Sequence, residues 1–260
     1  MISVNPYVIN KQNNPPFIMP KIKTSKGDIY FHRKFLYIGI KQIDRDIAFE
    51  NLNIISQVLN KENINWGPYL GTLLGIVRDN NFIAWDEDTD LFILHEDEEK
   101  LKNALWVLID LGFEVIRYER RGLYSIMRKG EYVDFYILKE VSPTLRFSGG
   151  GSDYIFSKFL EETILWNFRG MPIKIFKQYE EYLTFQYGDW KTPVQYADFN
   201  LNIFKRTFYR LKSFIKNNLP DNLYYYLLRK HHLKHFQNFK EKCKKNGIII
   251  PEHIKLPEFR

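Results

Sequence analysis

Acidic residues stand at alternating positions in the segment 85–94, whose sequence is WDEDTDLFIL. Asp86, Asp88 and Asp90 are two residues apart, so in a strand or its extended lead-in their carboxylates lie on one face. Like charges at this separation repel one another unless a divalent cation neutralises them, and Mg²⁺ prefers such oxygen ligands together with substrate phosphates. The apolar run after the acids favours this metal site, with Mg²⁺ or Mn²⁺ as the ion, over a solvated acidic loop.

A second carboxylate in a similar setting is Asp134, in the segment EYVDFYIL. Asp134 alternates with Val133 and Phe135 and shares a strand face with Tyr132 and Tyr136. Burial of a lone carboxylate among apolar side chains is costly unless it is paired or coordinated. The sequence therefore predicts that Asp134 has a charged partner or a metal ion beside it.

A possible phosphate site precedes the acids, in the segment LGTLLG at 70–75. We expect Gly71 and Thr72 at a turn from strand to helix, where backbone N–H groups, a hydroxyl and the helix dipole can all face a phosphate. Arg78, further along the same helix, can fork onto a phosphate or brace a carboxylate. The plain alternatives are an ordinary helix start and a surface arginine.

The elements that must position these side chains follow from hydrophobic periodicity. An amphipathic helix at 41–60, a short strand at 64–70 and a buried strand at 89–94 precede a helix at 95–112. Three strands then form a meander, with a Lys129–Gly130 turn between the last two. The remaining expected elements are a hairpin at 168–176, a short helix at 178–188, and tail helices at 204–216 and 221–235, separated by Pro220. The pattern predicts an α/β fold, and the family resemblance described below implies a mixed β-sheet flanked by helices.

Composition sets the class and the domain limits. With 260 residues, 45% of them hydrophobic, the chain is long enough for a real core. Its single cysteine, Cys243, excludes a disulfide scaffold and a cysteine zinc cage, and no apolar run reaches the roughly 20 residues of a membrane span. We expect a cytoplasmic protein with an N-terminal arm at 1–27 that holds little core, a catalytic domain at 28–200, and a basic helical extension at 201–260.

The basic extension carries most of the positive charge. Residues 201–245 hold twelve Lys and Arg against two acids, and Phe204, Phe208, Leu211 and Ile215 form an apolar stripe beside them. Such a segment attracts nucleic acid, anionic lipid or a polyanionic substrate. We rank a nucleic-acid-binding module below a helix that lies on an anionic membrane, at the inner membrane face.

The segment LGTLLGIVRDNNFIAWDEDTDLFI resembles the signature of the LicD family, which includes bacterial phosphocholine transferases and fukutin-type polyol-phosphate transferases with a nucleotidyltransferase fold. The family run is G-x-L-L-G-x-V-R, a spacer, and I-P-W-D-D-D-x-D. Ala84 replaces its proline, Glu87 its middle aspartate, and Asp79 a residue that is often histidine. VDFYIL and the segment at 181–193 resemble later family elements, so the resemblance covers roughly residues 40–195. In the later segment, Tyr187, Gly188 and Trp190 are expected to close the fold.

The resemblance implies a role for each matching residue. Asp88 and Asp90 would be the principal metal ligands, with Asp86 as an auxiliary one. Asp134 would complete a second metal site or accept the proton of the acceptor hydroxyl. Gly71 and Thr72 would hold donor phosphates, and Arg78 would bind phosphate or order the acidic cluster.

The resemblance also implies the reaction. It is a Mg²⁺-dependent transfer of phosphocholine, phosphoethanolamine or a polyol phosphate from a CDP-activated donor to a hydroxyl of a cell-surface glycan, with a lipid-linked acceptor as one form. A nucleotidyltransferase that adds a nucleoside monophosphate to a small acceptor is the alternative. Nothing in the residue spacing identifies the alcohol or the acceptor sugar.

Overall fold

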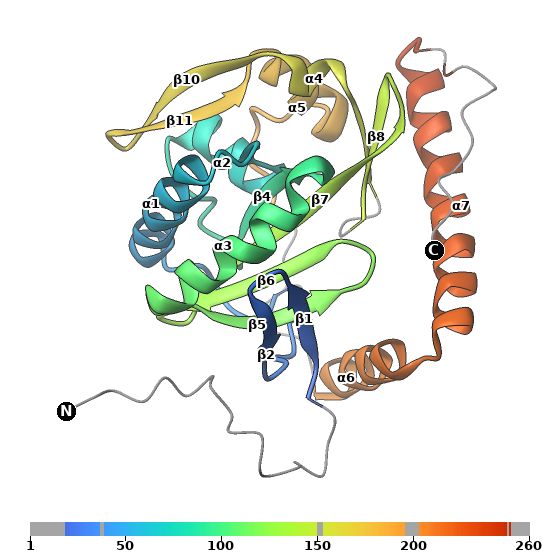
Figure 1. Cartoon of the computed structure of the whole chain (residues 1–260). Helices are drawn as coiled ribbons and strands as arrows, with labels where there is room; N and C mark the ends of the chain where they lie inside the picture. Colours follow the sequence, from blue (N-terminus) through green and yellow to red (C-terminus); the bar gives the residue numbers. More distant parts are fainter. Residues whose placement is uncertain (1–18, 37–38, 150–152, 196–202, 249, 251–260) are drawn as a thin grey trace.

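A seven-stranded mixed sheet forms the centre of the computed structural model, which describes residues 19–36, 39–149, 153–195, 203–248 and 250 (Figure 1). Five strands lie in the order β3-β4-β7-β6-β5, while β8 pairs with β7, and β9 with β8. Only β4 and β7 pair in parallel among these described strands. The strands are β3 (Trp66–Pro68), β4 (Thr89–Leu94), β5 (Glu114–Glu119), β6 (Leu123–Arg128), β7 (Glu131–Ser142), β8 (Leu145–Ser148) and β9 (Asp153–Phe156).

The predicted meander is confirmed in β5, β6 and β7, which are antiparallel neighbours. Lys129 and Gly130 both have positive φ, 53° and 84°, as the tight turn of a two-residue hairpin requires. Alternation along β7 places Asp134 and Tyr136 on one face and Val133, Phe135 and Ile137 on the other. The buried strand expected at 89–94 is β4, with the same bounds.

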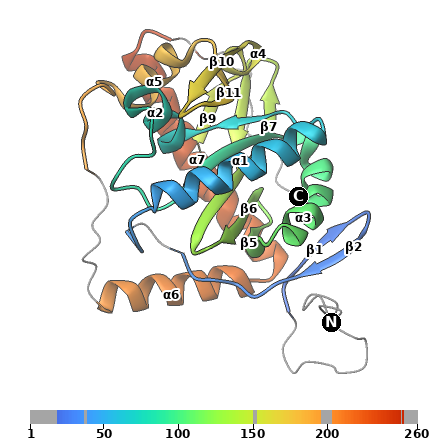
Figure 2. The ribbon, with the colours of Figure 1, turned by 90° about the vertical axis from the view of Figure 1, so that its left-hand side faces the viewer.

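Two helices cover one face of the sheet: α1 (Arg45–Lys61) and α3 (Glu98–Asp110) lie side by side in both views (Figures 1 and 2). A short 3₁₀ turn, η1 (His95–Asp97), leads into α3, and Gly112 ends the helix region with φ 90°. A further helix, α2 (Leu70–Asp79), joins β3 to the loop before β4. These elements confirm the helix–strand–helix order expected for residues 41–112.

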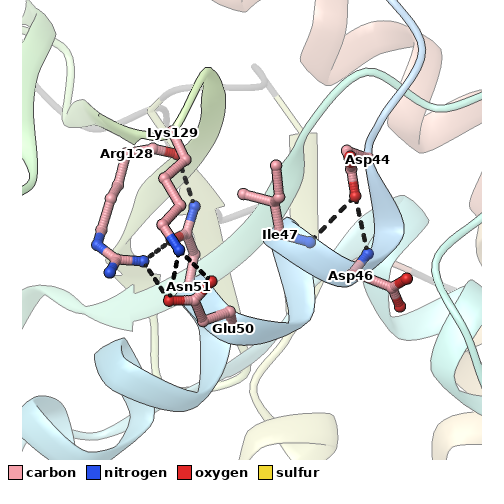
Figure 3. Close-up of polar contacts among 7 residues, drawn as sticks. All are labelled: Asp44, Asp46, Ile47, Glu50, Asn51, Arg128 and Lys129. Atoms are coloured by element: carbon pink, nitrogen blue, oxygen red, sulfur yellow. Dashed lines mark hydrogen bonds and ion pairs between the residues drawn. The ribbon is translucent and has the colours of Figure 1, made fainter.

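Polar contacts fix α1 against the β6–β7 turn (Figure 3). The Asp44 carboxylate caps the helix by accepting from the backbone N–H groups of Asp46 and Ile47, both at 3.1 Å. Asn51, fully buried, donates to the Arg128 carbonyl at 3.0 Å. Arg128 also donates to the Glu50 carboxylate at 2.9 Å. Because this turn sets the register of β7, α1 helps to place Asp134.

The second half of the chain has more strands than the sequence predicts. The hairpin expected at 168–176 is longer: β10 (Thr163–Phe168) pairs with β11 (Met171–Phe176) through Arg169–Gly170. Strands β8 and β9 were not expected. In β10 the apolar Leu165 is exposed, so polar and apolar residues do not alternate along this strand. The short helices are α4 (Lys158–Glu161) and α5 (Tyr179–Tyr187), of which α5 was predicted.

A small hairpin begins the described part of the chain. Strands β1 (Lys21–Thr24) and β2 (Gly27–Tyr30) pair, and Ile22 and Ile29 are buried in the core. The Trp106 indole of α3 donates to the Thr24 hydroxyl at 3.0 Å. The expectation that residues 1–27 hold little core stays a prediction, because only Ile22 is buried among residues 19–27 and residues 1–18 lie outside the described part.

Two helices end the described chain: α6 (Ile203–Asn218) and α7 (Asp221–Lys245), with Pro220 between them as expected. Helix α7 runs ten residues beyond the predicted end at 235 because Phe236, Phe239 and Cys243 are buried against the β8–β9 region and α5. None of the helices in the described ranges combines the length and the apolar character needed to cross a membrane.

Candidate active site

The acidic residues predicted from the sequence meet in a cavity of about 480 Å³ beside α2 and the sheet. Its lining combines carboxylates with arginines and aromatic side chains. The lining residues that concern the chemistry are Gly71, Arg78, Asp86, Asp88, Asp90, Arg117, Asp134, Tyr136, Tyr187, Asp189 and Trp190.

The register of four strands aligns the charged residues in one row. Asp90 of β4 is opposite Asp134 of β7, Asp134 is opposite Ser125 of β6, and Ser125 is opposite Arg117 of β5. Residues directly opposite one another in neighbouring strands project from the same face. The sheet therefore brings together two aspartates that are far apart in the sequence.

Three carboxylates form a compact cluster. Asp88, Asp90 and Asp134 each offer one oxygen, and these oxygens lie within 4.8 Å of one another. Asp134 Oδ2 accepts a charge-assisted hydrogen bond from Arg117, whereas the buried Oδ1 has no hydrogen-bond partner among the described residues. An unsatisfied buried carboxylate oxygen is costly. The donor set and this oxygen therefore fit a hard divalent cation.

The electrostatics of the cluster favour the same conclusion. Burial, followed by repulsion from the neighbouring carboxylates, raises the pKa of Asp88 and Asp90 well above the usual range. Burial also raises the pKa of Asp86 to about 6 and, with repulsion from Asp86, that of Glu87 to about 7. A bound cation would reverse this effect by favouring the ionised carboxylates.

Helix α2 begins directly against the acids. A Cβ atom on Gly71 would lie 2.5 Å from Asp86 Oδ2 and 3.7 Å from Asp90 Oδ2, so only glycine leaves room for these carboxylates. Leu70, the first helical residue, has φ 44°, an uncommon conformation for a residue with a side chain. Asp86 lies at this helix start, outside the cluster of three.

Thr72 does not line the cavity. Its side chain is buried, and its hydroxyl oxygen accepts a hydrogen bond from the Asp90 backbone N–H at 2.8 Å. The expectation that the hydroxyl donates to a phosphate is therefore not supported. Thr72 instead ties α2 to the β4 residue that carries a cluster carboxylate.

Arg78 lines the cavity but does not touch the acidic cluster. Its Nε and Nη2 donate to the two carboxylate oxygens of Asp79, both at 2.8 Å, and Nη1 approaches the Trp190 carbonyl at 3.5 Å. The expected bracing of the acids is thus replaced by a fork onto Asp79, the position at which the family often has histidine. Arg78 remains a candidate phosphate contact.

Sequence reasoning missed Arg117. The β5–β6 register shifts between Val115 and Arg117, so Ile116 is an extra residue in β5. A bulge of this kind changes which face the following side chains occupy, and here Arg117 joins the acidic row. Its Nε also donates to Ser125 Oγ at 2.8 Å. Tyr187 and Trp190, which were expected to close the fold, line the cavity as well, and so does Asp189.

The mixed sheet, its acidic row and the glycine at the start of α2 together form an α/β domain with a candidate metal site. Residues 63–144 match the family described as LicD/FKTN/FKRP, nucleotidyltransferase domain. The matched segment contains Asp88, Asp90 and Asp134, so the chain is similar to the LicD family over about a third of its length, and this similarity supports a transferase.

Two curated relatives match part of the chain. An uncharacterized protein of Rickettsia prowazekii (strain Madrid E) is 40% identical over 84 residues, which is 32% of this chain and 30% of that protein. One of Rickettsia typhi (strain ATCC VR-144 / Wilmington) is 39% identical over 59 residues, 23% of this chain and 19% of that protein. The chain thus spans less than a third of the length of either relative.

Solved structures with detectable similarity include two antibiotic-modifying enzymes. The lincosamide antibiotic adenylyltransferase LnuA, bound to lincomycin, has a TM-score of 0.38 and 11% identity over 63% of this chain and 96% of that chain. ANT(2'')-Ia, in complex with adenylyl-2''-tobramycin, has a TM-score of 0.40 and 15% identity over 72% of this chain and 99% of that chain.

Proposed function

We propose that the chain is a Mg²⁺-dependent phosphotransferase that moves a phospho-alcohol from a CDP-activated donor to a hydroxyl of a cell-surface glycan. The observation that carries this proposal is the cluster of Asp88, Asp90 and Asp134 oxygens within 4.8 Å, in a cavity that also contains Arg78. The similarity of the same segment to the LicD family supports transfer of a phospho-alcohol.

Asp88 and Asp90 would hold the metal, with Asp134 as the third carboxylate. The bound ion supplies charge neutralisation for the donor diphosphate and for the nucleoside monophosphate that leaves. Gly71 opens the start of α2 to close approach by a donor phosphate. Arg78 offers a guanidinium at the cavity wall, already oriented by Asp79.

Asp134 has one oxygen available for this chemistry. Arg117 holds Oδ2, which leaves Oδ1 either to a second metal ion or to the proton of the acceptor hydroxyl. In the reaction, the acceptor O–H bond breaks, a bond forms between that oxygen and the phosphorus next to the alcohol, and the bond from this phosphorus to the nucleoside monophosphate breaks. The phospho-alcohol is thereby attached to the acceptor.

The first test is a donor screen. We expect CDP-choline, CDP-ethanolamine, CDP-glycerol or CDP-ribitol to raise the melting temperature in the presence of Mg²⁺ and not in its absence. The alternative function, transfer of a nucleotidyl group, is favoured by the nucleotidyltransferase description of the family. Product analysis distinguishes the two functions, because phospho-alcohol transfer releases CMP, whereas nucleotidyl transfer from CTP releases pyrophosphate.

Substitution of a metal ligand is the second test. Asp88→Asn should abolish Mg²⁺-dependent turnover, because it removes a proposed metal ligand. The variant should keep the fold, because burial and repulsion from neighbouring carboxylates disfavour the charged Asp88 side chain. Asp110→Asn, an exposed position at the end of α3, is the matched control and should keep full activity. Full turnover by the Asp88→Asn variant would exclude the proposal.

A further inference from the structure

A second cavity lies next to the active site. It has a volume of about 1120 Å³ and is bordered by β5 and α6, and helix α6 lies beside β5 and β6 in both views (Figures 1 and 2). Arg117 and Arg121 line both this cavity and the active-site cavity. Because Arg117 is the partner of Asp134, a molecule in the second cavity can reach the acidic row.

Cations dominate the lining of this second cavity, which we call the cationic cavity. Besides the two shared arginines, Arg33, Lys34, Arg210, Lys212 and Lys216 line it, and Glu119 is the single carboxylate in the lining. Arg121 and Lys216 both donate to this one carboxylate, at 2.5 and 2.6 Å. Arg33 and Lys212 form no salt bridge with a described residue. The surplus of positive charge favours an anionic ligand with several oxygens, such as a phosphate.

Burial strengthens the demand for an anion. Desolvation lowers the pKa of Lys216, although Glu119 attracts the ammonium group. A second negative charge beside Lys216 would stabilise the ammonium group, which has lost part of its hydration. Lys216 and Glu119 also join α6 to β5, so the wall of the cationic cavity is held to the sheet.

An apolar cavity continues from the cationic one. It has a volume of about 720 Å³ between α6 and α7, and Phe208, Leu211, Ile215 and Leu227 line it. These four side chains are 46 to 63% exposed. Arg121, Lys212 and Lys216 line both cavities, so positive charge stands at the entrance to the apolar surface. The pair of cavities therefore matches a molecule with a phosphate at one end of a hydrocarbon chain.

We infer that the acceptor glycan is carried on a lipid phosphate, whose phosphate occupies the cationic cavity and whose hydrocarbon chain lies along the apolar cavity between α6 and α7. This inference rests on the proposed function, in which the donor diphosphate belongs at the acidic cluster. The acceptor then approaches Asp134 from the side of Arg117. An amphiphilic acceptor also explains why exposed apolar side chains and cations occur together on α6.

The experiment uses the full chain without metal or CDP donor, and measures binding of farnesyl phosphate, farnesol and inorganic phosphate by calorimetry. Farnesyl phosphate should bind at least tenfold more tightly than either fragment. Lys212→Glu should weaken farnesyl phosphate binding at least tenfold. Leu227→Ser should weaken it severalfold without changing the affinity for inorganic phosphate, because it acts on the hydrocarbon chain only.

Lys23→Glu is the matched control, since it makes the same charge change at an exposed position of β1 outside all three cavities. Equal affinity in Lys212→Glu and Lys23→Glu would overturn the inference, as would inorganic phosphate that binds as tightly as farnesyl phosphate. If an oligonucleotide displaced farnesyl phosphate at a concentration below that of farnesyl phosphate itself, the inference would be overturned in favour of a nucleic-acid site.

The experiments distinguish failure of this inference from failure of the proposed function. Asp88→Asn should bind farnesyl phosphate as the wild-type chain does, because the acidic cluster takes no part in holding this ligand. Turnover of a CDP-alcohol together with no farnesyl phosphate binding would refute the inference alone. Binding of farnesyl phosphate without any CDP-alcohol turnover would refute the proposed function alone.

Discussion

Gly71 is the residue against which the Asp86 carboxylate packs. An alanine there would place Cβ 2.5 Å from Asp86 Oδ2, so the carboxylate must move. We expect Gly71→Ala to lower Mg²⁺-dependent turnover by about 10–100-fold, the range for a disturbed metal surrounding. Stability should change little, because alanine within a helix gains about 0.5–1 kcal/mol over glycine. Steady-state kinetics and urea unfolding measure the two effects.

Gly75 provides the comparison within the same helix. A Cβ there would lie 2.5 Å from the Asn81 carbonyl oxygen and 3.1 Å from the Ile83 nitrogen, both backbone atoms. Backbone cannot rotate away as a carboxylate can, so Gly75→Ala should cost about 1–3 kcal/mol of stability. If Gly71→Ala lost as much stability as Gly75→Ala, the specific role of Gly71 in placing Asp86 would be refuted.

Arg117 balances the charge of Asp134 in the acidic row. Asp134 is buried, whereas the Arg117 side chain is 24% exposed, so removal of the arginine should cost less than the about 3–5 kcal/mol expected for a fully buried ion pair. We therefore expect Arg117→Gln to unfold at a lower urea concentration, and Asp134→Asn to restore part of that loss in the same chain. A double-mutant cycle measures the coupling. Strictly additive losses would show that the two residues do not act as a pair.

At the scale of elements, a hydrogen bond from the Asp90 N–H to the Thr72 hydroxyl ties α2 to β4, next to one from the Tyr69 N–H to the Asp90 carbonyl. Thr72→Val keeps the side-chain shape and leaves the Asp90 N–H without an acceptor, which should cost about 1–3 kcal/mol. Thr72→Ser keeps the hydroxyl and should retain most of the stability. Thermal unfolding of the two variants compares them, and equal stability would show that water replaces the threonine oxygen.

Elements defined by local pattern were predictable from the sequence. β4 is a continuous apolar run, α3 has acids at its start and a glycine beyond its end, and Lys129–Gly130 is a turn signal. These signals lie within a few residues of the element that they define. The acidic segment and Gly71 could therefore be placed beside β4 and α2 before any pairing of strands was known.

Features that depend on pairing could not be predicted. The bulge at Ile116 turns Arg117 toward Asp134, and nothing within β5 itself marks the extra residue. The sequence has glycine at positions 149–151, but it does not indicate why position 149 requires glycine. In the structure, a Cβ on Gly149 would lie 1.6 Å from the Arg121 carbonyl oxygen. Such contacts join segments that are distant in the sequence, so a single sequence carries no local signal of them.

At the scale of the whole molecule, α7 completes the core beyond the segment that resembles the family. Phe236, Phe239 and Cys243 pack with Phe147 and Phe185, and Cys243 is fully buried. Arg120 pairs with Asp221 and lies 4.0 Å from the Tyr224 ring, which holds the start of α7 to the β5–β6 turn. Deletion of residues 201–260 would expose this cluster, so point substitutions are the sharper probes of the extension.

The contact between β9 and α7 makes stability depend on pH through Asp153. Burial raises the pKa of Asp153 to about 6, while Lys242 of α7 and Arg121 lower it. The folded state therefore binds this proton more tightly than the unfolded state, whose ordinary value is 3.8. Stability falls as pH rises between these two values, and the penalty persists above the higher one. Its size is on the order of 1–3 kcal/mol, at 1.36 kcal/mol for each pKa unit.

Asp153→Asn removes the ionisable group and should abolish this pH dependence. At about pH 7.5 the variant should be more stable than the wild-type chain by about 1–3 kcal/mol, and at about pH 4 the two should be nearly equal, because the wild-type carboxyl is then largely protonated. Urea unfolding at both pH values measures the difference, with Asp110→Asn as the exposed control. An equal gain at both pH values would show that the amide packs better for reasons unrelated to the proton. A loss at the higher pH would show that the charge attraction of Lys242 and Arg121 outweighs the burial of the carboxylate.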